Sequence, residues 1–205
     1  MRLRSDSIQP GQPIAATYAM GQADGFGGNR NPHLAWDAVP AGTQSFVLLC
    51  VDPDVPTVAE MVGRDDVQIP VAQPRTDFVH WVAVDLPADL RAIAEGSASD
   101  GVVAKGKQPP PGLAGARQGL NSYTDWFAGD AAMGGDYYGY DGPYPPANDL
   151  RVHRYFFRLF ALDLARLDVP ARFTAADALR AMQGHVLAEA SLHGTSTLNP
   201  AAKYA

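Results

Sequence analysis

The sequence has a single cysteine, Cys50, among its 205 residues. An intrachain disulfide is therefore impossible, and the apolar neighbours of Cys50 indicate a small buried side chain. This sparing use of cysteine is typical of a reducing compartment. We therefore expect a cytoplasmic protein.

Long hydrophobic runs and basic clusters are missing too. No stretch of 18 or more consecutive apolar residues occurs, which is about the length that a membrane-spanning helix needs. The N-terminal segment MRLRSDSIQPGQPI has no apolar run behind its two arginines, so we expect neither a secretory signal nor membrane insertion. The net charge is -6, and without a basic stripe the sequence argues against nucleic acid as a partner.

Motifs of several enzyme classes are also lacking. The sequence contains no closely spaced histidine pair such as HExxH, no G-x-S-x-G nucleophile elbow and no glycine-rich phosphate-binding motif. Cys50 shows no sign of activation as a thiolate. We therefore expect no metal, no cofactor and no enzymatic activity. A hydrolase that uses His80 and His153 as acid and base is the less favoured alternative.

Three stretches carry the strand patterns that define the fold class. Residues 45–51 are continuously apolar, as in a buried strand, and residues 78–86 and 153–163 combine alternation with large apolar groups. The alternation over 78–86 places His80 on the face opposite Trp81. With 46% hydrophobic residues, the chain predicts one mainly β domain over 1–205, with loose ends near 1–10 and 200–205.

The remaining segments predict weaker elements and long loops. We expect an early strand around 14–18, a strand at 34–36, an exposed insertion over 57–77 and a short helix or turn over 88–95. The region 96–141 is irregular but rich in aromatic residues, which favours a long ordered loop with a function. Thr174 and Asp177 resemble a capping box, which predicts a helix that ends near Gly194.

Polar residues gather at the ends or on the apolar faces of the predicted strands. These residues are Asp52, Asp54, His80, His153 and Tyr155. Each alone is weak, because a single histidine on an apolar strand is more often structural and Asp-Pro-Asp is more often a turn. Together with the stiff loop 142–146, they predict a small pocket rich in hydrogen-bond donors that binds an anion such as phosphate.

Four motifs in order along the chain resemble one family. They are DPDVP at 52–56, HWVAVDLP at 80–87, GLNSYTDW at 119–126, and GPYPP followed by HRYFFRLFALD up to residue 163. This combination is similar to the phosphatidylethanolamine-binding protein (PEBP) family, and most similar to its bacterial branch, which is often labelled Raf-kinase-inhibitor-like. The likeness extends from Ile14 to Thr195.

The resemblance implies a β-sandwich-like fold of mixed strands with one or two flanking helices, a homodimer, and an anion pocket at one end. It favours a non-enzymatic binding protein for phospholipid head groups or other phosphorylated small ligands, with a kinase or protease inhibitor that acts through the pocket rim as the alternative. With no clear C-terminal gating helix, we expect the loop 106–141 to close the pocket. The resemblance and the residue pattern together predict a ligand-binding set of Asp52, Asp54, Pro56, His80, Gly142, Tyr144, His153 and Tyr155.

Overall fold

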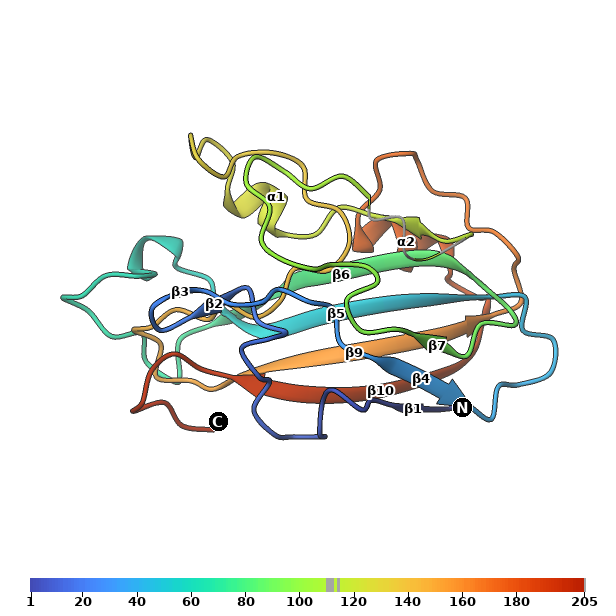
Figure 1. The fold of residues 1–205 in the computed structure, drawn as a ribbon, viewed down its shortest axis with the longest axis horizontal. Coiled ribbons are helices and arrows are strands. Elements are labelled where there is room, and N and C mark those ends of the chain that lie inside the picture. The colour runs from blue at the N-terminus through green and yellow to red at the C-terminus, as the bar shows by residue number, and fades with distance from the viewer. Residues whose placement is uncertain (110–112, 114, 205) are drawn as a thin grey trace.

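The centre of the molecule is a five-stranded antiparallel sheet with the strand order β10-β9-β5-β6-β8 (Figure 1). The computed structural model describes residues 1–109, 113 and 115–204. Its long strands are β5 (Ser45–Pro56), β6 (Arg75–Pro87), β9 (His153–Leu162) and β10 (Val186–Ser196), and β8 (Arg117–Gln118) is short.

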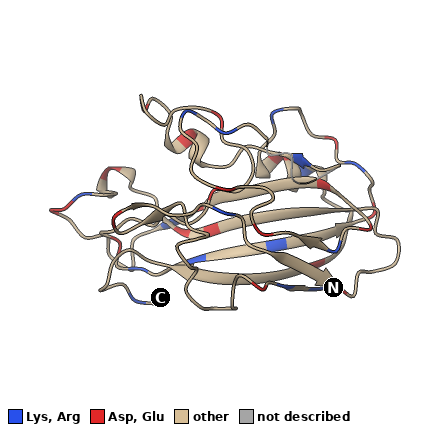
Figure 2. Cartoon of the chain, in the orientation of Figure 1, with Lys and Arg blue, Asp and Glu red and all other residues tan. Residues whose placement is uncertain are grey.

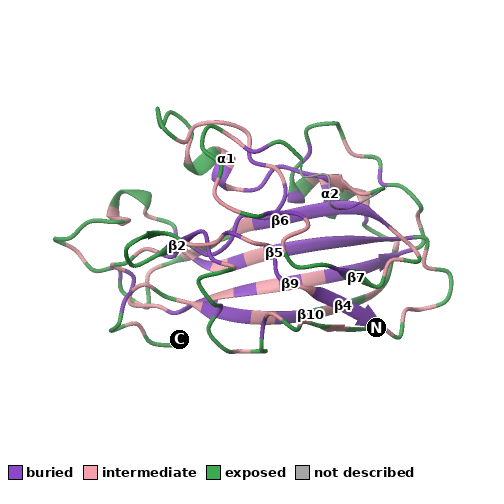
Figure 3. Cartoon of the chain, in the orientation of Figure 1, coloured by how far each residue is buried: buried purple, intermediate pink, exposed green. Residues whose placement is uncertain are grey.

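A smaller sheet and a helix cover the two faces of the central sheet. The smaller sheet has the order β1-β4-β7, from β1 (Arg2–Arg4), β4 (Leu34–Asp37) and β7 (Ala92–Ile93). Its side chains share one core cluster with alternate residues of β9, such as Phe157 and Leu159. Phe160 and Leu162 belong to a second cluster with the helix α2 (Ala175–Ala181). Figure 3 shows the middle of the sheet buried between these layers, so the predicted mainly β fold class is confirmed.

The remaining elements are short and lie in the connections. They are the hairpin strands β2 (Gly21–Gln22) and β3 (Gly25–Phe26), the 3₁₀ turn η1 (Ala59–Met61) and the helix α1 (Tyr123–Trp126). Among the residues that the structure describes, no helix is long and apolar enough to cross a membrane. Lys and Arg are interspersed with Asp and Glu over the chain (Figure 2).

The strand predictions over 34–36, 45–51, 78–86 and 153–163 are confirmed, but two other predictions are wrong. The helix that starts after Thr174 ends at Ala181, and the residues expected to continue it form β10, which pairs with β9. Gly184, at a φ of 85°, reverses the chain between them, and pairing with a long neighbouring strand outweighs the helical spacing. The second wrong prediction is the early strand, because 14–18 forms no strand. Over 88–95 a turn is present at Ala88 and Asp89, and Ala92–Ile93 then pairs with β4.

Both ends of the chain are more fixed than we expected. Arg2–Arg4 pairs with β4 as strand β1. Near the other end, Lys203 forms an isolated bridge with Arg151, and its backbone carbonyl accepts a hydrogen bond from the Val152 N–H. These contacts hold the C-terminal segment against the start of β9.

Candidate functional site

A cavity of about 390 Å³ lies at the end of the central sheet where β5 ends and both β6 and β9 begin. In Figure 1 this is the end near β2 and β3. The three long strands provide the polar inner wall, and loop residues provide an apolar and aromatic rim. The lining residues are Gln22, Ala23, Asp52, Val55, Val62, Gly63, Phe78, His80, Tyr123, Trp126, Phe127, Tyr144, Pro145, Pro146, Ala147, His153, Tyr155 and Leu198.

His153 is held between two carboxylates. Its Nδ1 lies 2.7 Å from Asp52 Oδ2 and its Nε2 lies 3.0 Å from Asp149 Oδ2. Because a carboxylate can only accept, both ring nitrogens carry hydrogen and the ring is an imidazolium. Burial would lower the pKa of His153, but the hydrogen bonds to Asp149 and Asp52 outweigh it and raise the pKa to about 9. His153 therefore has no N–H left to give to a ligand.

An ion-pair network behind His153 fixes these carboxylates. Asp149 receives both guanidinium arms of Arg75. Asp54 accepts from Arg151 at 2.9 Å and from the side chain of Arg154 at 2.8 and 2.9 Å. Burial would raise the pKa of Asp54, but its arginine partners hold that pKa below the ordinary value. The carboxylate of Asp54 is therefore occupied by these arginines. The Asp54 backbone N–H donates to Asp52 Oδ1 at 2.8 Å and so helps to fix the Asp52 carboxylate.

A β-bulge turns His80 toward the cavity. In the β5–β6 register Cys50 pairs with Trp81 and Val51 pairs with Val79, so His80 is the extra residue between them. The His80 ring consequently packs against Tyr155 at 5.1 Å between ring centroids. Tyr155 and Trp81 share one core cluster, so the predicted placement of His80 on the face opposite Trp81 is wrong.

The two ring nitrogens of His80 have different surroundings. Nδ1 lies 2.7 Å from the backbone carbonyl oxygen of Asp141, and because a carbonyl only accepts, this nitrogen is the one that carries hydrogen. Nε2 forms no hydrogen bond with any residue that the structure describes and is left for the cavity. Burial lowers the pKa of His80 despite the nearby carboxylate of Asp52, which favours the neutral ring.

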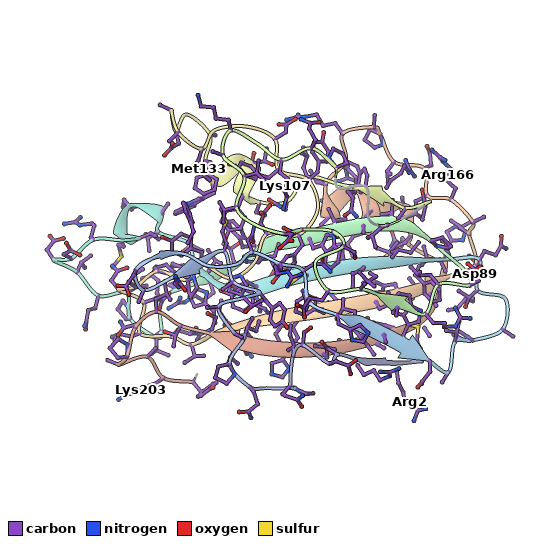
Figure 4. All side chains as sticks on the ribbon, viewed as in Figure 1. Arg2, Asp89, Lys107, Met133, Arg166 and Lys203 are labelled. Carbon is purple, nitrogen blue, oxygen red and sulfur yellow. The ribbon has the colours of Figure 1, made fainter. Side chains whose placement is uncertain are left out.

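A second buried polar cluster fixes Asp141. Its carboxylate accepts from Lys107 Nζ at 2.8 Å, from Asn29 at 2.7 Å and from Asn121 at 2.7 Å. Lys107 lies among the loops beside α1 (Figure 4), and its ammonium also donates to the Tyr140 carbonyl. Burial lowers the pKa of Lys107, while Asp141 opposes that shift. The cluster holds the carbonyl that sets the tautomer of His80.

The phenol of Tyr155 adds a donor to the inner wall. Burial and then the charge of Asp52 raise the pKa of Tyr155 well above its ordinary value, so its hydroxyl keeps its proton. The Tyr155 hydroxyl lies beside the carboxylate of Asp52, and the hydroxyl of Tyr123 donates to the Gly142 carbonyl at 2.9 Å.

Aromatic side chains from three loops form the rim. Tyr144 is 42% exposed and Trp126 is 44% exposed. Tyr144 lies against Gly21, where an added Cβ would come within 1.9 Å of its ring. Phe26 lies edge-on to Tyr144, at 6.2 Å between ring centroids. Trp126 and Phe127 come from the loop 106–141, of which residues 110–112 and 114 lie outside the described part.

The structure brings together five of the eight residues that the sequence predicted for the site. Pro56 is buried in the pairing of β5 with Arg75. The N–H of Gly142 donates to Asn29 Oδ1, and a Cβ there would lie 2.0 Å from the Tyr18 carbonyl oxygen. These two residues and Asp54 support the cavity without lining it. The five that do line it are Asp52, His80, Tyr144, His153 and Tyr155.

The sequence reasoning missed the charged partners of the two histidines. Asp149 lies four residues before His153 and Asp141 lies directly before Gly142, so their nearness to predicted site residues was the available signal. Arg75 and Lys107 carry no such signal, because only the fold brings them to Asp149 and Asp141. Within the described residues no group of three or more His, Cys, Asp or Glu is arranged to hold a metal ion.

Comparisons with known proteins agree with this architecture. The model of the phosphatidylethanolamine-binding protein family matches residues 4–197. The UPF0098 protein YbhB of Escherichia coli is 35% identical over 94% of this chain and 97% of its own. A UPF0098 protein of Aquifex aeolicus is 30% identical over 95% of this chain and 86% of its own. The chain therefore belongs to the phosphatidylethanolamine-binding protein family.

Solved structures show the same fold. The E. coli YbcL structure, described as a member of the mammalian PEBP family, superimposes with a TM-score of 0.72 at 23% identity, over 96% of this chain and 97% of its own. A putative PEBP homologue of Chlamydia trachomatis, CT736, gives a TM-score of 0.64 at 29% identity, with 95% of each chain covered.

Proposed function

We propose that the protein is a non-enzymatic binding protein that takes a small phosphorylated or other anionic ligand into the cavity between Asp52, His80 and Tyr155. Family membership supports a binding protein. The observation that carries the proposal is the inner wall of the cavity, where His80 Nε2 has no hydrogen-bond partner among the described residues and the Tyr155 hydroxyl lies beside the carboxylate of Asp52. Buried polar groups normally have partners, and a hydroxyl of the ligand can supply one to His80 Nε2.

The state of His153 supports binding over hydrolysis. Both of its nitrogens are occupied by carboxylates, so it has no free position from which to exchange a proton with a substrate. A reaction that needs His80 and His153 as an acid–base pair therefore has only one available ring.

The size and lining of the cavity fit a head group better than a whole lipid. A volume of about 390 Å³ is at the lower end of the range for small-molecule sites, roughly 300–1,000 Å³. The aromatic rim gives apolar contact for the part of the ligand that projects from the cavity.

Calorimetric titration with phosphoethanolamine at pH 6 tests the proposal. The wild-type chain should bind, and Tyr155→Phe should bind at least about tenfold more weakly, because a hydrogen bond to a charged phosphate oxygen contributes roughly 1.5–3 kcal/mol. Tyr138→Phe is the matched control, since Tyr138 does not line this cavity. Absence of binding to the wild type, or equal affinities of the two variants, contradicts the proposal.

We further propose that the chain assembles as a homodimer, the state expected from the resemblance to bacterial PEBP proteins. The edge strand β10 offers a surface for this, with Val186 and Leu187 each about two-fifths exposed at 42% and 41%. Sedimentation equilibrium should give twice the chain mass, and replacement of both residues by serine should give the monomer. A wild-type monomer at all concentrations contradicts the assignment.

A further inference from the structure

The inner wall of the cavity offers acceptors and no unpaired cation. Among the described residues, no Lys or Arg lines the cavity. The positive charge of His153 is directed at Asp52 and Asp149. What the inner wall leaves for a ligand is the carboxylate of Asp52, the lone pair on His80 Nε2 and the hydroxyl of Tyr155, which lies beside Asp52. A fully ionised oxyanion would therefore meet one negative group and one lone pair.

The acceptor state of His80 is built into the surrounding fold. The Lys107–Asp141 ion pair and two asparagines fix the loop whose carbonyl receives His80 Nδ1–H. His80 is only 3% exposed, so the ring has little room to turn and exchange its nitrogens. The titratable or charged groups that face or act on this ring come from β5, the loop before 142, α1 and β9. They are Asp52, Asp141 with Lys107, Tyr123, His153 and Tyr155.

An anion that keeps an acidic hydroxyl matches these atoms. Its O–H can donate to Asp52 or to His80 Nε2, and its remaining oxygens can accept from Tyr155. If the proton passes fully to His80, the ring becomes a donor to the anion, and the complex still holds the same number of protons. In both cases the ligand and its site together carry one proton more than a fully ionised anion beside a neutral ring.

We propose that the cavity selects phosphorylated ligands whose phosphate retains an ionisable hydroxyl, namely free phosphate and phosphate monoesters, over phosphodiesters and sulfate. The proposal rests on the proposed function, because it names which anions occupy the same cavity. It also distinguishes two sources of phosphate groups, namely phospholipids and soluble phosphometabolites. The phosphate of a phospholipid with an esterified head group is a diester that keeps no hydroxyl near neutral pH, whereas a soluble phosphometabolite commonly carries a monoester.

A panel of small ligands tests the selection on the unmodified chain. Phosphoethanolamine and glycerophosphoethanolamine carry the same ammonium group, but the first is a monoester and the second a diester. Calorimetry at pH 6 should show the monoester binding at least about tenfold more tightly, a difference of about 1.4 kcal/mol. Phosphate should likewise bind more tightly than sulfate. Diester and monoester of equal affinity, or sulfate equal to phosphate, overturn the proposal.

The pH dependence gives a second reading from the same ligand. The second pKa of a phosphate monoester is about 6, so the fraction of the ligand that keeps this proton falls about tenfold per pH unit well above that value. The affinity for phosphoethanolamine should fall in parallel between pH 6 and pH 8. An affinity that stays constant over this range overturns the proposal. If no anion binds at any pH, the proposed function itself fails, which is a distinguishable result.

The variant His80→Asn isolates the cavity-facing nitrogen. The asparagine amide can still donate to the Asp141 carbonyl, but the position of Nε2 is left empty. The preference for monoester over diester should shrink at least about threefold, while His185→Asn, a change at an exposed pair with Asp163, should leave it unchanged. A full preference in a folded His80→Asn overturns the role of His80. If that variant does not fold, the ligand panel on the wild type decides alone.

Discussion

At the scale of single residues, the two histidines of the site differ in what their nitrogens contact. His153 donates from both nitrogens to carboxylates, so it acts as a buried positive link between β5 and the loop before β9. His80 donates from one nitrogen only and keeps the other for the cavity. The sequence showed two similar imidazoles at strand ends, and only the partners distinguish a structural cation from a ligand-binding base.

Removal of the His153 ring should destabilise the fold strongly. His153→Ala leaves Asp52 and Asp149 buried without the cation that they share, and breaking a buried charge pair costs about 3–5 kcal/mol. Urea denaturation followed by circular dichroism measures this change. His185→Ala, at an exposed pair, should cost less than about 1 kcal/mol. A similar small cost for both variants would show that His153 is not a buried link.

The same residue predicts how stability depends on pH. The folded pKa of His153 is about 9, above its ordinary value of 6.5, so the folded state binds the proton more tightly. Its contribution is fully present below pH 6.5, declines above that value, and is lost as pH rises through 9. The loss amounts to about 3 kcal/mol, because one pKa unit corresponds to about 1.4 kcal/mol. Denaturation midpoints between pH 6 and pH 10 should fall accordingly, and in a folded His153→Gln variant this fall should be much smaller.

At the scale of elements, strand patterns were predictable and strand irregularities were not. Alternating side chains, together with large apolar residues on both faces, allowed β6 and β9 to be predicted from the sequence. The alternation could not locate the bulge at His80, because a bulge arises from the register between two strands that are paired only in the fold. For the same reason the helical spacing after Gly184 predicted a helix where pairing with β9 produces β10.

The capping box at the start of α2, which the sequence predicted correctly, can be tested directly. Asp177 Oδ2 accepts from the Thr174 N–H at 2.9 Å and from its hydroxyl at 2.8 Å. Asp177→Ala removes this cap and should lower the free energy of unfolding by about 1 kcal/mol. Chemical denaturation measures the change. Asp168→Ala is the control, because Asp168 lies in the preceding loop and takes no part in the helix cap. No difference between the two variants would contradict a role of the cap.

The helix α1 and its flanking residue should report on ligand binding. Trp126 lines the cavity and is 44% exposed, whereas Trp36 and Trp81 are 2% and 0% exposed in the core. A ligand in the cavity should therefore change the fluorescence of Trp126 chiefly. Trp126→Phe should abolish the fluorescence change on titration with phosphoethanolamine, while calorimetry still detects binding. A change that persists in this variant would place the ligand elsewhere.

At the scale of the whole molecule, the site depends on the meeting of three strands that are distant in sequence. Asp52, His80 and His153 come from β5, β6 and β9. Because β5 runs antiparallel to both β6 and β9, the end of β5 and the starts of β6 and β9 lie at the same end of the sheet. The resemblance to PEBP proteins allowed this convergence to be expected. The buried ion pairs behind it, from Arg75 and Lys107, depend on loop paths that carry no pattern in the sequence.

Nitrogen-15 NMR of the histidine rings, recorded with and without phosphoethanolamine across pH 6 to 8, tests the central assignment most directly. We expect both nitrogens of His153 to remain protonated throughout and to change little with ligand. His80 should show hydrogen on Nδ1 and a free Nε2 whose resonance shifts when the ligand binds. A His153 ring that titrates near its ordinary pKa, or a His80 Nε2 that ignores the ligand, would contradict this account.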